Sequence, residues 1–103
     1  MTSKNEPKKH KSPDRIWTIE FDDRARGELR KLDTGTQQTI LRYLRERIAT
    51  AEDPRRFGKP LRQNLAGLWR YRVEDFRTLC RIEDERIVVL VLQFGHRREV
   101  YED

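Results

Sequence analysis

Three strand-like runs in the second half of the chain constrain its fold more than any other feature. They are "LWRYRV" (68–73), "FRTLCRI" (76–82) and "RIVVLVLQF" (86–94), and all three are rich in β-branched, aromatic and aliphatic residues. Acidic pairs, Glu74-Asp75 and Asp84-Glu85, separate them. Such breaks are long enough for a tight turn but too short for a crossover between parallel strands. The three runs are therefore predicted to form an antiparallel meander.

The first half of the domain adds one strand and one helix before a second helix begins. "IWTIEF" (16–21) alternates apolar and polar residues, as a half-buried strand does. Asp22 and Asp23 follow and can cap a helix N-terminus. The apolar positions of that helix recur at helical spacing. They are Ala25, Leu29 and Leu32.

A second helix is predicted from Thr34, which has capping-box spacing to Gln37, to a point before Pro54. Its expected buried positions are Ile40, Leu41, Leu44, Ile48 and Ala51. The element order is then β-α-α-β-β-β. We expect an α+β fold in which two N-terminal helices pack on one face of a small antiparallel sheet.

Length and composition limit the remaining possibilities. The 103 residues suffice for one domain, which we place at residues 16–103. Residues 1–15 are basic and lack the apolar core of a secretory signal, so we expect a disordered arm. No apolar run is long enough to span a membrane. The single cysteine, Cys80, rules out an internal disulfide and fits a reducing cytoplasm, and no ligand cluster suggests a metal or other cofactor.

Positive charge is concentrated in one stretch. The formal net charge is +5, yet residues 54–73 hold six basic side chains and no acidic one. A basic block beside nearly balanced segments indicates a localised surface for a polyanion. A solvated basic loop is the alternative interpretation of the same stretch.

The predicted hairpin over 68–82 sorts its side chains onto two faces. With Glu74-Asp75 as the turn, cross-strand partners have residue numbers that sum to 149, and an odd-numbered turn would flip one strand. The apolar face, which the helices should cover, receives Trp69, Tyr71, Val73, Phe76, Thr78 and Cys80. We assign the two large aromatic residues of this set to the core rather than to base stacking.

The opposite face of the hairpin receives four arginines, which are Arg70, Arg72, Arg77 and Arg81. Arg72 would lie directly opposite Arg77, and like charges in that arrangement destabilise a strand pair. Four arginines with no carboxylate among them favour a bound anion over a merely exposed face. Their planar guanidinium groups match the oxygens of a phosphate.

The closing segment "FGHRREVYED" (94–103) brings further polar side chains to the end of the last strand. We expect Gly95 to bend or bulge the strand and so turn the following side chains toward the arginines. Histidine is the side chain type that changes charge near neutral pH, which makes His96 a candidate for proton transfer. A structural role is the competing interpretation of a lone histidine after a strand.

Two stretches, "GKPLRQNLAGLWRYRVEDFRTLCRI" (58–82) and "VLQFGHRREVY" (91–101), resemble the RelE/ParE superfamily of bacterial toxins. The resemblance covers about residues 16–101 and is closer to the RelE branch than to the gyrase-directed ParE branch. It implies a cytoplasmic toxin that a cognate antitoxin neutralises and that cleaves mRNA in the ribosomal A site. It also implies a metal-independent reaction, in which the ribose 2′-OH attacks the adjacent phosphate and leaves a 2′,3′-cyclic phosphate.

The resemblance also assigns site residues. The basic residues of the family's second strand match Arg70 and Arg72, the arginine that begins its third strand matches Arg77, and those of its C-terminal segment match Arg97 and Tyr101. Relatives often carry lysine at the first two positions. Arginine stays protonated, so it stabilises charge but carries protons poorly.

Roles follow for the remaining candidates. Tyr101 is a candidate proton acceptor, because neighbouring guanidinium groups favour a phenolate. Arg97 is placed to stabilise the leaving group. Lys59, Arg62 and Arg81 are candidate contacts to RNA, a salt-dependent kind of binding.

Two other function classes stay open at this point. One is a toxin that inhibits DNA gyrase, and the other is a catalytically silent module that binds nucleic acid or an antitoxin. The concentrated arginines favour RNA cleavage over gyrase inhibition, because an inhibitor that binds a protein needs no phosphate clamp.

Overall fold

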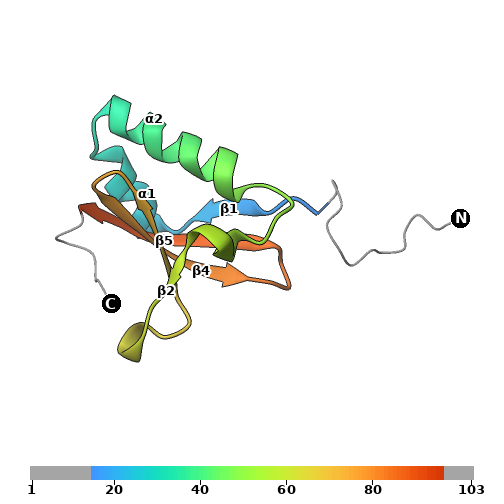
Figure 1. The fold of residues 1–103 in the computed structure, drawn as a ribbon. Coiled ribbons are helices and arrows are strands. Elements are labelled where there is room, and N and C mark those ends of the chain that lie inside the picture. The colour runs from blue at the N-terminus through green and yellow to red at the C-terminus, as the bar shows by residue number, and fades with distance from the viewer. Residues whose placement is uncertain (1–14, 97–103) are drawn as a thin grey trace, which may run out of the picture.

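In the computed structural model, which describes residues 15–96, a five-stranded sheet carries the helices on one face (Figure 1). The strand order is β1-β5-β4-β3-β2. The strands are β1 (Thr18–Phe21), β2 (Lys59–Pro60), β3 (Trp69–Val73), β4 (Phe76–Glu83) and β5 (Val88–His96). The helices are α1 (Asp23–Arg30), α2 (Thr34–Tyr43), a π-helical turn η2 (Leu44–Ile48) and the 3₁₀ turns η3 (Pro54–Phe57) and η4 (Gln63–Leu65). The predicted α+β class is confirmed.

The predicted register of the central hairpin is confirmed in full. β3 and β4 are antiparallel, with Trp69 opposite Cys80 and Arg72 opposite Arg77. β4 and β5 continue the meander in antiparallel pairing. Glu74, in the turn, has a φ of 55°, which is the left-handed conformation that a tight hairpin turn requires.

Two features of the sheet were not predicted. β1 pairs with β5 in parallel, so the sheet is mostly antiparallel and not, as the sequence had led us to expect, wholly antiparallel. β2 is a two-residue edge strand that pairs antiparallel with β3, Lys59 opposite Arg70. Two residues, one of them a proline, are too few to show an alternating pattern.

The first helix starts as predicted and the second does not. Asp22 caps α1, and its Oδ1 accepts a hydrogen bond from the Ala25 backbone N–H at 2.9 Å. The capping box proposed at Thr34 is wrong, because Asp33 is the N-cap of α2 and Thr34 already lies in the helix. Gln37 instead donates its side-chain amide to the Leu32 carbonyl at 2.8 Å.

The core lies between the helices and the sheet face that they cover. Half of the apolar helix positions predicted from the sequence are buried there, whereas the others are only half-buried, namely Leu29, Leu32, Leu41 and Ala51. The buried cluster comprises Ala25, Ile40, Leu44, Ile48, Tyr71, Val73, Cys80, Val89, Val91 and Phe94. No helix among residues 15–96 is both long and apolar enough to cross a membrane.

A β-bulge interrupts the pairing of β4 with β5. Leu79 pairs with Gln93 while Cys80 pairs with Val91, so Leu92 is the extra residue. The bend or bulge was predicted at Gly95, and this position is wrong because the bulge lies at Leu92. Gly95 itself lies within β5, in register with Arg77.

Candidate functional site

Four basic side chains gather on the sheet face that the helices leave open. The register places Lys59 beside Arg70 and Arg72 beside Arg77, and side chains of directly paired residues share one face at about 5 Å separation. Arg70 and Arg72 share that face because they lie two residues apart on β3. These four residues, on β2, β3 and β4, form what we name the basic cluster.

The members of the basic cluster differ in exposure. Arg77 is only 5% exposed and Arg70 is half-buried, whereas Arg72 and Lys59 are exposed. Gly95, the β5 partner of Arg77, has no side chain that could compete with the arginine for space. Arg72 forms no ion pair in the part of the chain that the structure describes. The cluster thus combines two cations that are buried or half-buried with two that are exposed to a ligand.

The same face carries carboxylates at its other end, which corrects the expectation of arginines alone. Arg81 Nε lies 3.3 Å from Glu83 Oε2, and Arg86 bridges Glu83 Oε1 at 2.6 Å and Glu20 Oε2 at 3.0 Å. Hydrogen bonds from Arg86 and then from Arg81 lower the pKa of Glu83. Arg81 therefore belongs to a mixed-charge network and not to the basic cluster.

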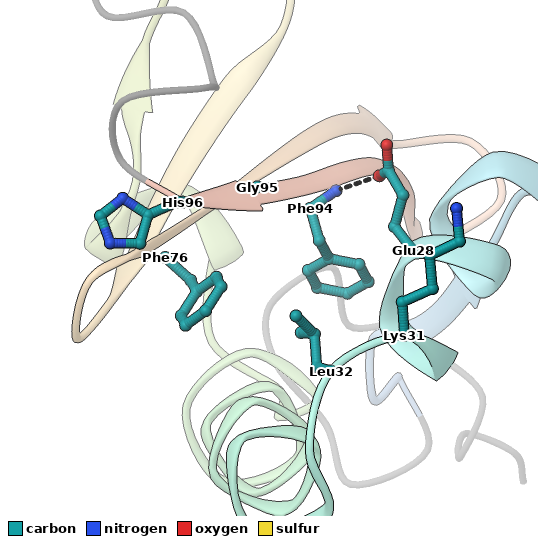
Figure 2. Close-up of a pocket in the computed structure, with 7 residues that line it drawn as sticks. All are labelled: Glu28, Lys31, Leu32, Phe76, Phe94, Gly95 and His96. Carbon is teal, nitrogen blue, oxygen red and sulfur yellow. Dashed lines mark hydrogen bonds between the residues drawn. The ribbon is translucent and has the colours of Figure 1, made fainter.

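His96 lies on the opposite face from the basic cluster. It pairs with Phe76, and the two rings meet edge to face with 5.7 Å between their centres. Together with the end of α1 they border a pocket of about 190 Å³ (Figure 2), lined by Glu28, Lys31, Leu32, Phe76, Phe94, Gly95 and His96. The structure does not bring the His96 ring to Arg72 and Arg77.

Glu28 is a tether for β5 that sequence reasoning missed. The Phe94 backbone N–H donates to Glu28 Oε1 at 2.7 Å, as the dashed line in Figure 2 shows. β1 ends at Phe21, in register with Val91, so β5 runs beyond its parallel neighbour and a side chain takes the place of a strand. No local pattern could indicate a contact between residues 66 positions apart.

The other predicted site residues have different outcomes. Arg70, Arg72 and Arg77 are brought together as expected, with Lys59 beside them. Arg62 is exposed and precedes η4. Arg97 and Tyr101 lie outside the described residues.

The chemistry available to the described residues is that of charge stabilisation. Burial raises the pKa of the Cys80 thiol and of the Tyr71 phenol, so neither ionises readily. Residues 15–96 contain no group of three or more His, Cys, Asp or Glu side chains arranged to hold a metal ion. The basic cluster can bind and stabilise a phosphate through guanidinium and ammonium donors.

The sequence of this chain matches a family of known toxins. Residues 19–101 match the model of the ParE toxin of type II toxin–antitoxin systems, parDE. The chain belongs to this family. Toxin RelG of Mycobacterium tuberculosis is 34% identical over 85 residues, which cover 82% of this chain and 95% of RelG. The chain is therefore a type II toxin of the RelE/ParE family.

Solved structures agree with that assignment. The M. tuberculosis toxin–antitoxin complex RelBE2 contains a chain of 33% identity that superimposes with a TM-score of 0.73, covering 82% of this chain and 94% of that one. The isolated Escherichia coli RelE toxin has a TM-score of 0.62 at 23% identity, covering 78% and 83% of the two chains, and shows the same fold. The sheet and helices of this ParE-family chain are thus those of RelE-like toxins.

Proposed function

We propose that this toxin is a ribosome-dependent endoribonuclease that cleaves mRNA in the ribosomal A site. The basic cluster is the observation that supports the proposal. Three arginines and a lysine from three neighbouring strands meet on one face, and Arg72 directly opposes Arg77. Such an arrangement of like charges is unfavourable by itself and becomes favourable around a phosphate.

The proposed reaction is a transesterification. The ribose 2′-oxygen forms a bond to the adjacent phosphorus as the bond to the 5′-oxygen breaks, which leaves a 2′,3′-cyclic phosphate. Arg70, Arg72 and Arg77 stabilise the negative charge that the phosphorane develops. Tyr101 accepts the proton of the 2′-OH, and Arg97 stabilises the 5′-oxygen, which leaves as a hydroxyl after taking a proton from water. The reaction requires no metal ion.

The proposed partners follow from this activity. The chain acts on mRNA bound to the small ribosomal subunit, and it does so in the cytoplasm, where translation takes place. A cognate antitoxin protein blocks it. Similarity to toxin chains solved as toxin–antitoxin complexes, RelBE2 of M. tuberculosis and RelBE of E. coli, supports the antitoxin partner.

Mapping of mRNA 5′ ends after induction without an antitoxin tests the proposal. We expect new 5′ ends that appear only on translated messages, and we expect them to fall by about a hundredfold or more in Arg77→Ala and in Tyr101→Phe. Arg81→Gln is the matched control. Arg81 is already paired with Glu83, so this variant should keep most of the activity. A parallel assay for gyrase-trapped DNA breaks covers the other branch of the superfamily. DNA breaks without mRNA cleavage would contradict the proposal.

A further inference from the structure

An exposed aromatic ring lies beside two arginines on the helix side of the molecule, outside the basic cluster. Phe57, the last residue of η3, is 40% exposed, and among residues 15–96 only Ile16 is a comparably exposed large hydrophobic side chain. The guanidinium carbon of Arg56 lies 4.6 Å from the centre of the Phe57 ring, and that of Arg47 lies 5.5 Å away. We name Arg47, Arg56 and Phe57 the Phe57 patch.

The two arginines of the patch are held in different ways. Arg56 donates to the Asp53 carbonyl at 2.9 Å and to the Arg47 carbonyl at 3.2 Å, which ties η3 to the end of η2. The Arg47 side chain is exposed, its guanidinium lies over the Phe57 ring, and it forms no ion pair among the described residues. Arg47 sits in the π-helical turn, a type of distortion that often occurs at functional sites. Arg56 therefore has a structural role in the patch, whereas Arg47 is available to a ligand.

The Phe57 patch is connected to the basic cluster around the edge of the sheet. Phe57 and Lys59 are two residues apart, and Gly58 between them has extended backbone angles, φ −102° and ψ 172°. Extended chain spans about 7 Å over two residues. Lys59 belongs to the basic cluster, where it lies beside Arg70. One polymer chain lying across the short edge strand β2 can thus reach both surfaces.

We propose that the Phe57 patch is a second contact for single-stranded RNA, in which an unpaired base stacks on Phe57 and a phosphate binds Arg47. Aromatic rings interleaved with arginine are the usual surface for unpaired nucleotides, because rings stack on bases and guanidinium groups bind phosphates. An apolar protein partner fits less well, since the patch offers a single ring flanked by two cations. This inference rests on the proposed function for one point, which is that the strand bound by the basic cluster is RNA.

Fluorescence anisotropy of the full-length chain with a labelled 2′-O-methyl oligonucleotide of about 12 nucleotides tests the proposal. The blocked 2′-oxygen prevents cleavage, so binding is measured whether or not the chain is a nuclease. We expect Phe57→Leu to bind about five- to hundredfold more weakly with an unchanged salt dependence. Arg47→Gln should reduce the slope of log affinity against log salt by about 0.7. Arg30→Gln, which removes an exposed arginine at the end of α1, is the matched control and should bind as the wild type does.

Wild-type affinity and salt slope in both Phe57→Leu and Arg47→Gln would overturn the proposal. Photo-crosslinking with a 4-thiouridine oligonucleotide gives an independent measure, and crosslinks confined to peptides of the basic cluster would also contradict it. Circular dichroism checks folding, and if Phe57→Leu is unfolded, the result for Arg47→Gln decides. The two proposals can fail separately. If the wild-type chain cuts no mRNA, the proposed function is overturned. If the patch variants nevertheless bind the oligonucleotide more weakly than the wild type, this inference stands.

Discussion

The Tyr71 hydroxyl is the polar group that anchors the start of η3 to the core. The side chain is fully buried, and its Oη donates to the Pro54 carbonyl at 2.7 Å, across 17 residues. In Tyr71→Phe that carbonyl loses its donor inside the protein. We expect the free energy of unfolding to fall by about 1–3 kcal/mol, measured by urea denaturation with an unchanged m-value. Tyr43→Phe is the control, since the half-buried Tyr43 hydroxyl has no hydrogen bond among residues 15–96, and an equal loss there would contradict this account.

Cys80 should be chemically silent in the native protein. The thiol is fully buried, and burial raises its pKa, so the reactive thiolate is disfavoured in the folded state. Labelling by a disulfide reagent at pH 8 must then wait for an opening of the sheet. We expect it to be at least about a thousandfold slower than in urea-unfolded chain. The native rate should rise with pH, because the thiolate fraction of the open form rises. Rapid native labelling would contradict the buried position.

At the level of elements, two glycines are expected to respond oppositely to alanine. A Cβ on Gly58 would lie 3.1 Å from Cε1 of the fully buried Tyr71 and 3.2 Å from Cε3 of the half-buried Trp69. We expect Gly58→Ala to destabilise the protein by about 1–3 kcal/mol. Gly27, within α1, meets nothing within 4 Å, so Gly27→Ala should stabilise it by about 0.5–1 kcal/mol. Thermal unfolding of both variants checks the pair, and equal signs would refute it.

The hairpin β3–β4 was predictable because its information is local. A two-residue turn and the two-residue period of a strand fix which side chains share a face, and so place Arg72 opposite Arg77. The bulge at Leu92 was not predictable in this way. It depends on how two strands adapt to each other, and the glycine that suggested a bend proved to be the in-register partner of Arg77.

The candidate site divides along the same line. The alternation of side chains along a strand predicted which arginines share a face of the hairpin. It could not predict that Arg81 pairs with Glu83, because that contact depends on the side-chain conformations. Glu28 and Phe94 are joined across 66 residues, and Arg47 meets Phe57 only because η3 folds back on η2. Contacts of this kind follow from packing, which a single sequence does not display.

Over the whole molecule, charge is distributed unevenly on the open face of the sheet. The basic cluster occupies one end, and the Arg81–Glu83–Arg86–Glu20 network occupies the other. Cations that are already neutralised by neighbours release few counterions on binding a polyanion, whereas open cations release one for each phosphate that they bind. The face should therefore bind RNA at one end.

Salt dependence separates the two ends of the face. We expect log affinity for a 2′-O-methyl oligonucleotide to fall linearly with log salt, and Arg72→Gln to reduce the slope by about 0.7, the value for one lost phosphate contact on a single strand. Arg81→Gln removes the same formal charge four residues beyond Arg77 on β4, yet Glu83 already neutralises that charge, so the slope should stay near the wild-type value. Equal slope changes in the two variants, measured by fluorescence anisotropy, would show that general charge and not the basic cluster directs binding.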